Sequence, residues 1–239
     1  MPRVVRVPAT ASTMDLLHGL AADGAEAGTV VVAGEQTGGR GSRGRSWRSP
    51  VGGLWLSVLF RPGDAAGVEL VGLRTGLAVA AAIEALGPGV PVRIKWPNDL
   101  MVGDRKLGGV LCEARWQGET LAWVVAGVGI NVSNPIPPEL ADVAIALADR
   151  LPGIGPELVE PEVTVRLRAL SPSAERLGAG ELSALQRRDW LLGRRLRAPA
   201  PGIAAGIAED GALLVRSETG GITAVRAGTV ELADRAPPA

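Results

Sequence analysis

A loop rich in glycine and arginine, at residues 38–48, places the strongest constraint on the fold. It follows a short β-branched run at residues 29–33 and precedes a second apolar run, Leu54–Phe60. Its glycine spacing formally matches the dinucleotide-binding and P-loop fingerprints, both of which need a helix immediately after the loop. Here the chain continues WRSPVGG, which does not favour a helix. We therefore exclude both of these nucleotide-binding folds.

The rest of the chain predicts an α+β fold with a mixed sheet flanked by helices. Apolar periodicity and turn signals predict helices at residues 12–20, 69–86, 139–150, 162–177 (kinked at Pro172) and 181–192, and strands at residues 4–7, 29–33, 54–60, 92–96, 107–115 and 121–128. The first helix opens with the form of a capping box, Ser12 to Asp15. After Gly193, short β-rich runs separated by Asp-Gly and Gly-Gly pairs predict a small β domain. We therefore predict two domains, residues 1–192 and 193–239.

Composition excludes several classes of function. The 239 residues carry 25 basic and 25 acidic side chains, and this zero net charge gives no argument for nucleic acid or a membrane surface. The single cysteine excludes an intrachain disulfide and a cysteine-based zinc site. No signal peptide and no apolar run of about 18 residues is present, so we expect a cytoplasmic protein without a membrane partner.

The basic residues are almost all arginine. Only Lys95 and Lys106 are lysines among the 25 basic residues, which suggests that both were selected for their chemistry. The single histidine, His18, is expected to be a partly exposed residue of the first helix.

The loop at residues 38–48 suits a polyanionic ligand. It holds four arginines within nine residues, and no acidic residue occurs between Glu35 and Asp64. Glycines leave backbone N–H groups accessible, and each charge-assisted hydrogen bond contributes about 1.5–3 kcal/mol. The alternative is a solvated basic loop or a nucleic-acid patch.

Two further segments carry candidate chemistry. A hairpin between residues 95–100 and 105–109 would bring Lys106 beside Asp99, where a lysine can bridge a carboxylate and an α-phosphate. Asp99 could bind Mg²⁺ or orient that lysine, or Asn98 and Asp99 could form an ordinary Asx turn. The glycines and the amide of Asn131 at residues 127–131 fit a nucleotide base or ribose, or simply a tight strand exit.

In this order and spacing, the segments resemble biotin protein ligases (biotin–[acetyl-CoA-carboxylase] ligases). The matching pieces are Ser12-Thr13, Glu35-Gln36-Thr37, the GRGSRGR loop at residues 39–45 with Trp47, and residues 95–100, 105–109 and 127–131. The resemblance covers almost the whole chain. It implies a catalytic domain of the class II aminoacyl-tRNA-synthetase-like, biotin–lipoate ligase type, followed by a small SH3-like β-barrel.

The resemblance also implies an activity in two steps. Biotin, ATP and Mg²⁺ would give biotinyl-5′-AMP and pyrophosphate, and a lysine of a biotin carboxyl carrier domain would then accept the biotin. The expected partner is therefore the carrier domain of a biotin-dependent carboxylase, and the expected assembly is a monomer or weak homodimer. Ser12 follows a single predicted strand, so we expect a monofunctional ligase that lacks the DNA-binding domain of repressor-type relatives.

The residue roles implied by the resemblance fall into three groups. Lys106 and Arg40 are the expected catalytic residues. Expected biotin contacts are Ser12, Thr13, Met14, Gln36, Arg40, Gly41, Ser42 and Lys106. Expected adenylate contacts are Arg43, Arg45, Trp47, Asn98 and Asn131, with Asp99 as the expected metal ligand.

The sequence departs from the family pattern at two positions. Met14 stands where the family commonly has Asn, which removes a polar contact near biotin. Ser42 stands where many members have a further Arg, which would loosen retention of the adenylate.

Two rival functions remain. A lipoate or octanoate ligase or transferase is disfavoured by the full loop and the KWPNDL segment. A nucleic-acid-binding module is disfavoured by zero net charge and an aromatic content of only 3 %.

Overall fold

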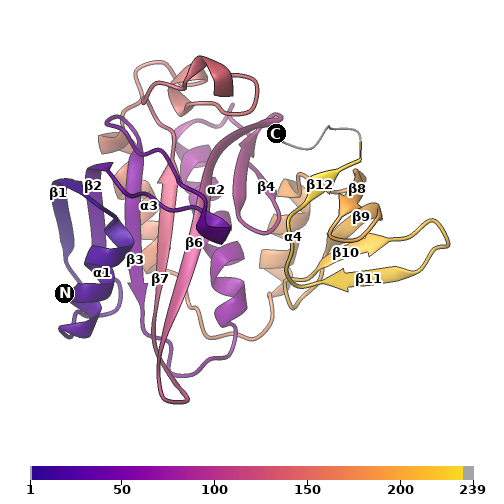
Figure 1. Cartoon of the computed structure of the whole chain (residues 1–239), viewed down its shortest axis with the longest axis horizontal. Coiled ribbons are helices and arrows are strands. Elements are labelled where there is room, and N and C mark those ends of the chain that lie inside the picture. The colour runs from indigo at the N-terminus through magenta and orange to yellow at the C-terminus, as the bar shows by residue number, and fades with distance from the viewer. Residues whose placement is uncertain (1, 234–239) are drawn as a thin grey trace.

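The computed structural model describes residues 2–233 and contains two β-sheets with helices packed around them (Figure 1). The larger sheet has the strand order β1-β2-β3-β7-β6-β5-β4. Its strands are β1 (Val4–Thr10), β2 (Val30–Gln36), β3 (Leu54–Phe60), β4 (Arg93–Lys95), β5 (Asp99–Val102), β6 (Arg105–Gln117) and β7 (Thr120–Ile130). β1 and β2 are parallel, whereas the other neighbouring pairs are antiparallel. This mixed sheet confirms the predicted fold class.

Alternation along the strands assigns the two faces of the larger sheet. Val31, Leu59 and Val125 pack beneath α1 (Thr13–Ala22) on one face. Their chain neighbours Val30, Val58 and Val124 lie in the main core with α2 (Val71–Leu86) and α3 (Pro156–Arg168) on the other face. Successive side chains of a strand point to opposite faces, and each buried aliphatic side chain contributes about 1.5–3 kcal/mol. The sheet is therefore buried on both faces.

The smaller sheet is antiparallel and lies beside β4 and α4 (Ala179–Arg188), as Figure 1 shows. Its strands are β8 (Arg195–Ala198), β9 (Gly202–Ile207), β10 (Leu213–Arg216), β11 (Ile222–Val225) and β12 (Glu231–Leu232), in the order β11-β10-β9-β8-β12. Leu196, Leu213 and Val215 belong to the same hydrophobic cluster as the larger sheet. The predicted boundary after residue 192 stays a prediction, and residues 234–239 of the predicted small domain lie outside the described residues.

No helix in residues 2–233 is long and apolar enough to cross a membrane.

The helix predicted at residues 139–150 is wrong. This segment contains only two short 3₁₀ turns, η3 (Pro138–Leu140) and η4 (Leu147–Asp149). Its backbone bonds go to other elements: Lys106 N–H donates to Val143, and Ile145 N–H donates back to the Lys106 carbonyl. Leu147 N–H donates to the Asn131 carbonyl. The segment therefore holds β6 and the end of β7 in place rather than forming a helix.

The helices predicted at residues 162–177 and 181–192 have different bounds. α3 begins at Pro156, ends at Arg168 and does not include Pro172, and α4 spans Ala179–Arg188. The buried guanidinium of Arg74 donates to the carbonyls of Pro172, Ala174 and Arg176, which keeps this connection out of a helix.

A hydrogen bond between the sheets yields the first prediction. The indole N–H of buried Trp96 donates to the Gly211 carbonyl at 2.9 Å. Trp96→Phe leaves that carbonyl without its donor, which should cost about 1–3 kcal/mol and lower the melting temperature by roughly 2–10 °C. Because the sheets share one core, calorimetry should show one unfolding transition. Trp116→Phe, at an exposed indole, is the matched control; an unchanged Trp96→Phe melting temperature would contradict this coupling.

Candidate active site

A row of glycines forms the floor of the candidate site. Gly109 lies opposite Gly129, and Leu111 opposite Gly127, in the β6–β7 ladder, so the glycines share one face of the sheet. A Cβ atom at Gly127 would lie 2.7 Å from the Met14 sulfur, and one at Gly129 would lie 2.6 Å from the Trp47 Nε1 atom. The missing side chains therefore make room for Met14 and Trp47 above the sheet.

A polar cluster closes one end of the site. Ser12 is the N-cap of α1, and its hydroxyl accepts from the Met14 N–H. The N–H and hydroxyl of Thr13 both donate to Gln36 Oε1, at 2.9 and 3.0 Å. Since the Thr13 hydrogen is used in this way, Ser57 donates to the Thr13 oxygen at 2.7 Å. The Gln36 amide nitrogen donates to Ser49, which fixes the orientation of the amide.

The glycine- and arginine-rich loop forms an irregular hairpin over this floor. Gly41 N–H donates to the Arg45 carbonyl at 2.7 Å, and Trp47 N–H donates to the Gly39 carbonyl at 2.8 Å. The next regular element is β3, which confirms that no helix follows the loop. Arg45 folds back onto Ser42, donating to its hydroxyl and its carbonyl.

Lys106 and Asp99 meet as the predicted hairpin requires. The Lys106 ammonium lies 2.6 Å from Asp99 Oδ1 and 5.0 Å from the centre of the Trp47 ring. Asp99 belongs to strand β5 rather than to a free turn, and Asn98 exchanges two hydrogen bonds with Val110. The indole N–H of Trp47 is buried and has no partner among the described residues, so it can donate to a ligand.

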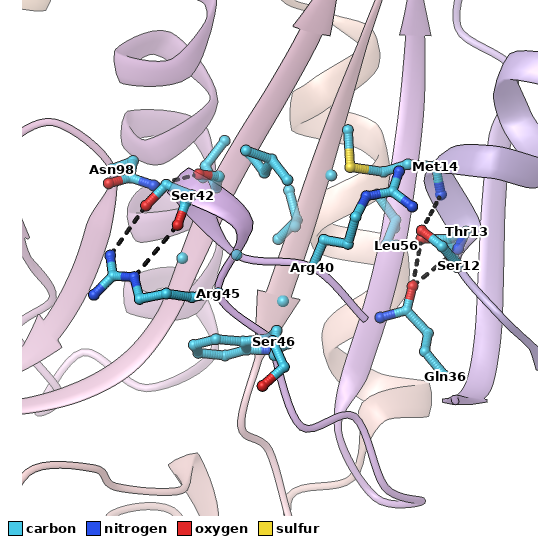
Figure 2. A pocket seen from close by; sticks show the side chains of 18 of the residues that line it. Ser12, Thr13, Met14, Gln36, Arg40, Ser42, Arg45, Ser46, Leu56 and Asn98 are labelled. Atoms are coloured by element: carbon cyan, nitrogen blue, oxygen red, sulfur yellow. Dashed lines mark hydrogen bonds between the residues drawn. The ribbon is translucent and has the colours of Figure 1, made fainter. Parts of the chain in front are cut away.

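Arg40 reaches across the middle of the site (Figure 2). Its guanidinium donates to both Asp15 oxygens, at 2.7 and 2.8 Å, and to Glu113 at 3.2 Å. The Arg40 hydrogen bond holds the pKa of Asp15 below its usual value, and Asp15 in turn raises the pKa of Arg40. The acidic residue of the predicted capping box therefore binds the loop.

These side chains enclose a small cavity of about 210 Å³. Figure 2 shows the polar cluster and Met14 at one end, Asn98, Ser42 and Arg45 at the other, and Arg40 between them. A large cavity of about 1060 Å³ adjoins it and is lined by Asp99, Asn131 and the proline-rich segment of residues 135–138. Five residues line both cavities: Gln36, Arg45, Ser46, Trp47 and Lys106. Two ligands could therefore meet at the Lys106 ammonium.

The structure brings together all but three of the predicted site residues in the small cavity. Those lining it are Ser12, Thr13, Met14, Gln36, Arg40, Gly41, Ser42, Arg45, Trp47, Asn98 and Lys106. Asp99 and Asn131 line the large cavity instead. Arg43 lies at the tip of the loop with a positive φ of 62° and lines a third cavity near the smaller sheet, which is also lined by Arg45, Asn98 and Asp99. Its predicted contact with the adenylate therefore stays a prediction.

Eight further residues line the small cavity, and none of them was assigned an individual role from the sequence. They are Ser46, Leu56, Gly109, Val110, Leu111, Gly127, Val128 and Gly129. The glycines of residues 127 and 129 were expected to contact a nucleotide base or ribose. Their alternation was also the signal for a cavity floor, because a strand seldom loses two side chains from the same face unless something approaches it closely.

The fold and the site define a mixed-sheet α+β protein with two adjoining cavities, the smaller of which has a floor of glycines. Residues 7–131 match the sequence profile of the Biotin/lipoate A/B protein ligase family. The chain belongs to this family.

Known proteins of similar sequence and structure support the assignment. A biotin–[acetyl-CoA-carboxylase] ligase from Paracoccus denitrificans is 30 % identical over 215 residues, covering 83 % of this chain and 88 % of that protein. The bifunctional ligase/repressor BirA of Bacillus spizizenii is 39 % identical over 142 residues, but this chain covers only 43 % of its length. The biotin protein ligase of Aquifex aeolicus in complex with biotin and ATP superimposes with a TM-score of 0.80 at 26 % identity, over 98 % of this chain and 100 % of that one.

The glycine floor yields the second prediction. Gly129→Ala forces a methyl group against the Trp47 indole and should destabilise the fold by about 1–3 kcal/mol in urea unfolding. Gly76→Ala is the matched control. Gly76 lies in helix α2, and a Cβ atom added there would meet Ile94 at 3.8 Å, which is an ordinary contact. The double variant Trp47→Ala/Gly129→Ala should lose less than the sum of the single losses, since the clash is absent. Additive losses would contradict this packing.

Proposed function

We propose that the chain is an ATP-dependent biotin–protein ligase. The observation that carries the proposal is the junction of the two cavities at Lys106, Trp47 and Arg45. In this arrangement the acid occupies the small cavity, the nucleotide occupies the large cavity, and the α-phosphate lies beside the Lys106 ammonium. The names of relatives that act on biotin support the choice of acid.

In the first step a carboxylate oxygen of biotin attacks the α-phosphorus of ATP. A new P–O bond forms, the bond to the β-phosphate oxygen breaks, and pyrophosphate leaves. The Lys106 ammonium, held by Asp99, donates to the α-phosphate oxygens as their charge grows. Arg40 and the Trp47 indole N–H supply further donors at the same place.

In the second step the ε-amine of an acceptor lysine attacks the acyl carbon of biotinyl-5′-AMP. A C–N bond forms, the C–O bond of the mixed anhydride breaks, and AMP leaves with the electron pair while the amine loses a proton. We propose a biotin carboxyl carrier domain as the acceptor, because a similar protein is a biotin–[acetyl-CoA-carboxylase] ligase. Until it arrives, the loop of residues 38–48 covers the mixed anhydride and limits its hydrolysis.

The donor set fits Mg²⁺ only when phosphates complete it. The described residues contain no cluster of three or more His, Cys, Asp or Glu side chains that could hold a metal. Asp99 is a single carboxylate, and Mg²⁺ in nucleotide sites commonly uses one or two carboxylates together with substrate phosphates and water. We therefore assign Asp99 two roles, as the partner of Lys106 and as the protein ligand for Mg²⁺ that enters with ATP.

The decisive assay incubates the protein with ATP, Mg²⁺, a purified biotin carboxyl carrier domain and either biotin or lipoate. Mass spectrometry of the carrier should show one biotinyl group on one lysine, and no lipoyl group in the parallel reaction. A carrier without biotin contradicts the proposal, and lipoylation alone reassigns the acid.

The third prediction concerns Lys106. Lys106→Ala should lower the rate of adenylate formation by about 10²–10³-fold, because a preorganised donor to the phosphate is lost. The bonds that join this residue to Val143 and Ile145 are made by the backbone, so the fold should persist. Pyrophosphate release measures the rate, and Arg216→Ala on β10 serves as a distant charge-removal control. A retained rate in folded Lys106→Ala removes this residue from its role.

The fourth prediction concerns Ser42. The Ser42 hydroxyl accepts from Arg45 at 3.1 Å but brings no charge to the cavity. Ser42→Arg should slow the release of biotinyl-5′-AMP about ten-fold through a charge-assisted bond to the phosphate. Release of radiolabelled adenylate after dilution measures the effect, with Ser42→Ala as the uncharged control. Equal rates of adenylate release from the wild type and Ser42→Arg would contradict the idea that the loop of residues 38–48 lacks an arginine at this position.

The proposed activity does not include transcriptional repression. The formal net charge of zero supports this part of the proposal, because operator binding relies on neutralising phosphates. Specific binding to a biotin-gene operator in a gel-shift assay would contradict it.

A further inference from the structure

A chain of hydrogen bonds outside the cavity leads from the sheet surface to Arg40. It joins Trp123 on β7, His18 on α1 and Glu113 on β6, residues that the proposed mechanism does not use. His18 is the single histidine of the chain. Its side chain is 10 % exposed, and the residue is partly buried on helix α1, in agreement with the partly exposed helix residue expected from the sequence.

The chemistry of the side chains decides which group donates and which accepts in each of these hydrogen bonds. The Trp123 indole can only donate, and its Nε1 lies 2.9 Å from His18 Nδ1, so Nδ1 accepts. The neutral ring therefore carries its proton on Nε2, which donates to Glu113 Oε2 at 3.1 Å. Burial lowers the pKa of His18 and favours this neutral form. Glu113 Oε1 is thereby left to accept from Arg40 at 3.2 Å.

The two carboxylates that hold Arg40 differ in how firmly they are fixed. Glu113 is 23 % exposed and also accepts a bond from Arg115 at 3.3 Å, in addition to those from His18 and Arg40. Asp15 is 55 % exposed and binds Arg40 from the first turn of α1. Asp15 makes the closer, bidentate contact with Arg40, at 2.7 and 2.8 Å against 3.2 Å for Glu113, but its exposure lets water and entering anions reach it. Asp15 is therefore the partner that an entering anion can replace, whereas Glu113 is also held by His18 and Arg115.

An anionic ligand in the small cavity would compete with Asp15. The three bonds to Asp15 and Glu113 use three of the five N–H groups of the Arg40 guanidinium. A ligand carboxylate or phosphate in the cavity needs the same guanidinium and is repelled by the Asp15 charge. Releasing Asp15 frees one N–H group on each of the two terminal nitrogens of Arg40, and these two groups can then form a bidentate bond to the ligand.

We propose that Glu113, oriented by His18, is a fixed anchor that positions Arg40 at the cavity, and that Asp15 is an internal competitor displaced by the ligand's anionic group. Asp15 thus holds the loop closed over an empty cavity and gives up Arg40 when the acid or its adenylate enters. The identity of the ligand rests on the proposed function, whereas the competition requires only an anion.

The test compares variants that should change affinity in opposite directions. Asp15→Asn should bind biotin roughly two- to five-fold more tightly in calorimetric titration, since an exposed competing ion pair is lost. Glu113→Gln and His18→Leu should bind biotin roughly ten-fold more weakly, because Arg40 loses its anchor. His18→Gln keeps a donor toward Glu113 and should restore most of the affinity. Asp23→Asn, at the exposed C-cap of α1, is the charge-matched control and should match the wild type.

A purely structural role would weaken every variant in proportion to its loss of melting temperature. Unchanged or weaker binding by Asp15→Asn overturns the competition. Wild-type binding by His18→Leu, or no difference between His18→Leu and His18→Gln, overturns the anchor.

A ligand-free measurement separates this inference from the proposed function. Trypsin should cleave after Arg43 and Arg45 faster in Glu113→Gln and His18→Leu than in the wild type, because the loop is less firmly held. Equal cleavage rates overturn the anchor whatever the ligand is. If the wild type binds lipoate and not biotin, the proposed function fails, and the same variant series with lipoate still tests the competition.

Discussion

The site depends on the register between β6 and β7. This pairing places Gly109, Gly127 and Gly129 on one face, where Met14 and Trp47 occupy the space that side chains would fill. A shift of one residue would turn the glycines toward the core and point the side chains of valines such as Val110 and Val128 at Met14 and Trp47. The buried valines on the core face thus hold the floor in position, because exposing them would cost several kcal/mol.

The charges of the loop are distributed rather than concentrated. Arg40 binds two carboxylates beside the cavity, Arg45 folds onto Ser42, and Arg48 lies 3.5 Å from Glu139. Backbone hydrogen bonds across the hairpin define its turns, and Arg40 ties the hairpin to Asp15 and Glu113. This arrangement leaves cationic groups beside both cavities, while three of the loop arginines are paired with acceptors.

Part of this arrangement could be predicted from the sequence. Lys106 lies beside Asp99 because only a few residues separate two strands that pair as a hairpin, and such short connections leave little choice. The segment of residues 139–150 could not be predicted in the same way. Its apolar residues fit a helical period, yet its backbone groups bond to Lys106 and Asn131. Local spacing cannot reveal that competition, because the partners belong to other parts of the chain.

The sequence by itself determined the α+β class, the absence of a helix after the loop, the two lysines and the polar residues at the start of α1. These follow from local chemistry, namely glycine and proline content, apolar period and the rarity of lysine. Only the tertiary structure decided that Asp15 binds Arg40 instead of completing a capping box, and that His18 joins Trp123 to Glu113. Those bonds link residues 25, 95 and 105 positions apart, so they exist only once packing has brought α1, the loop and the sheet together.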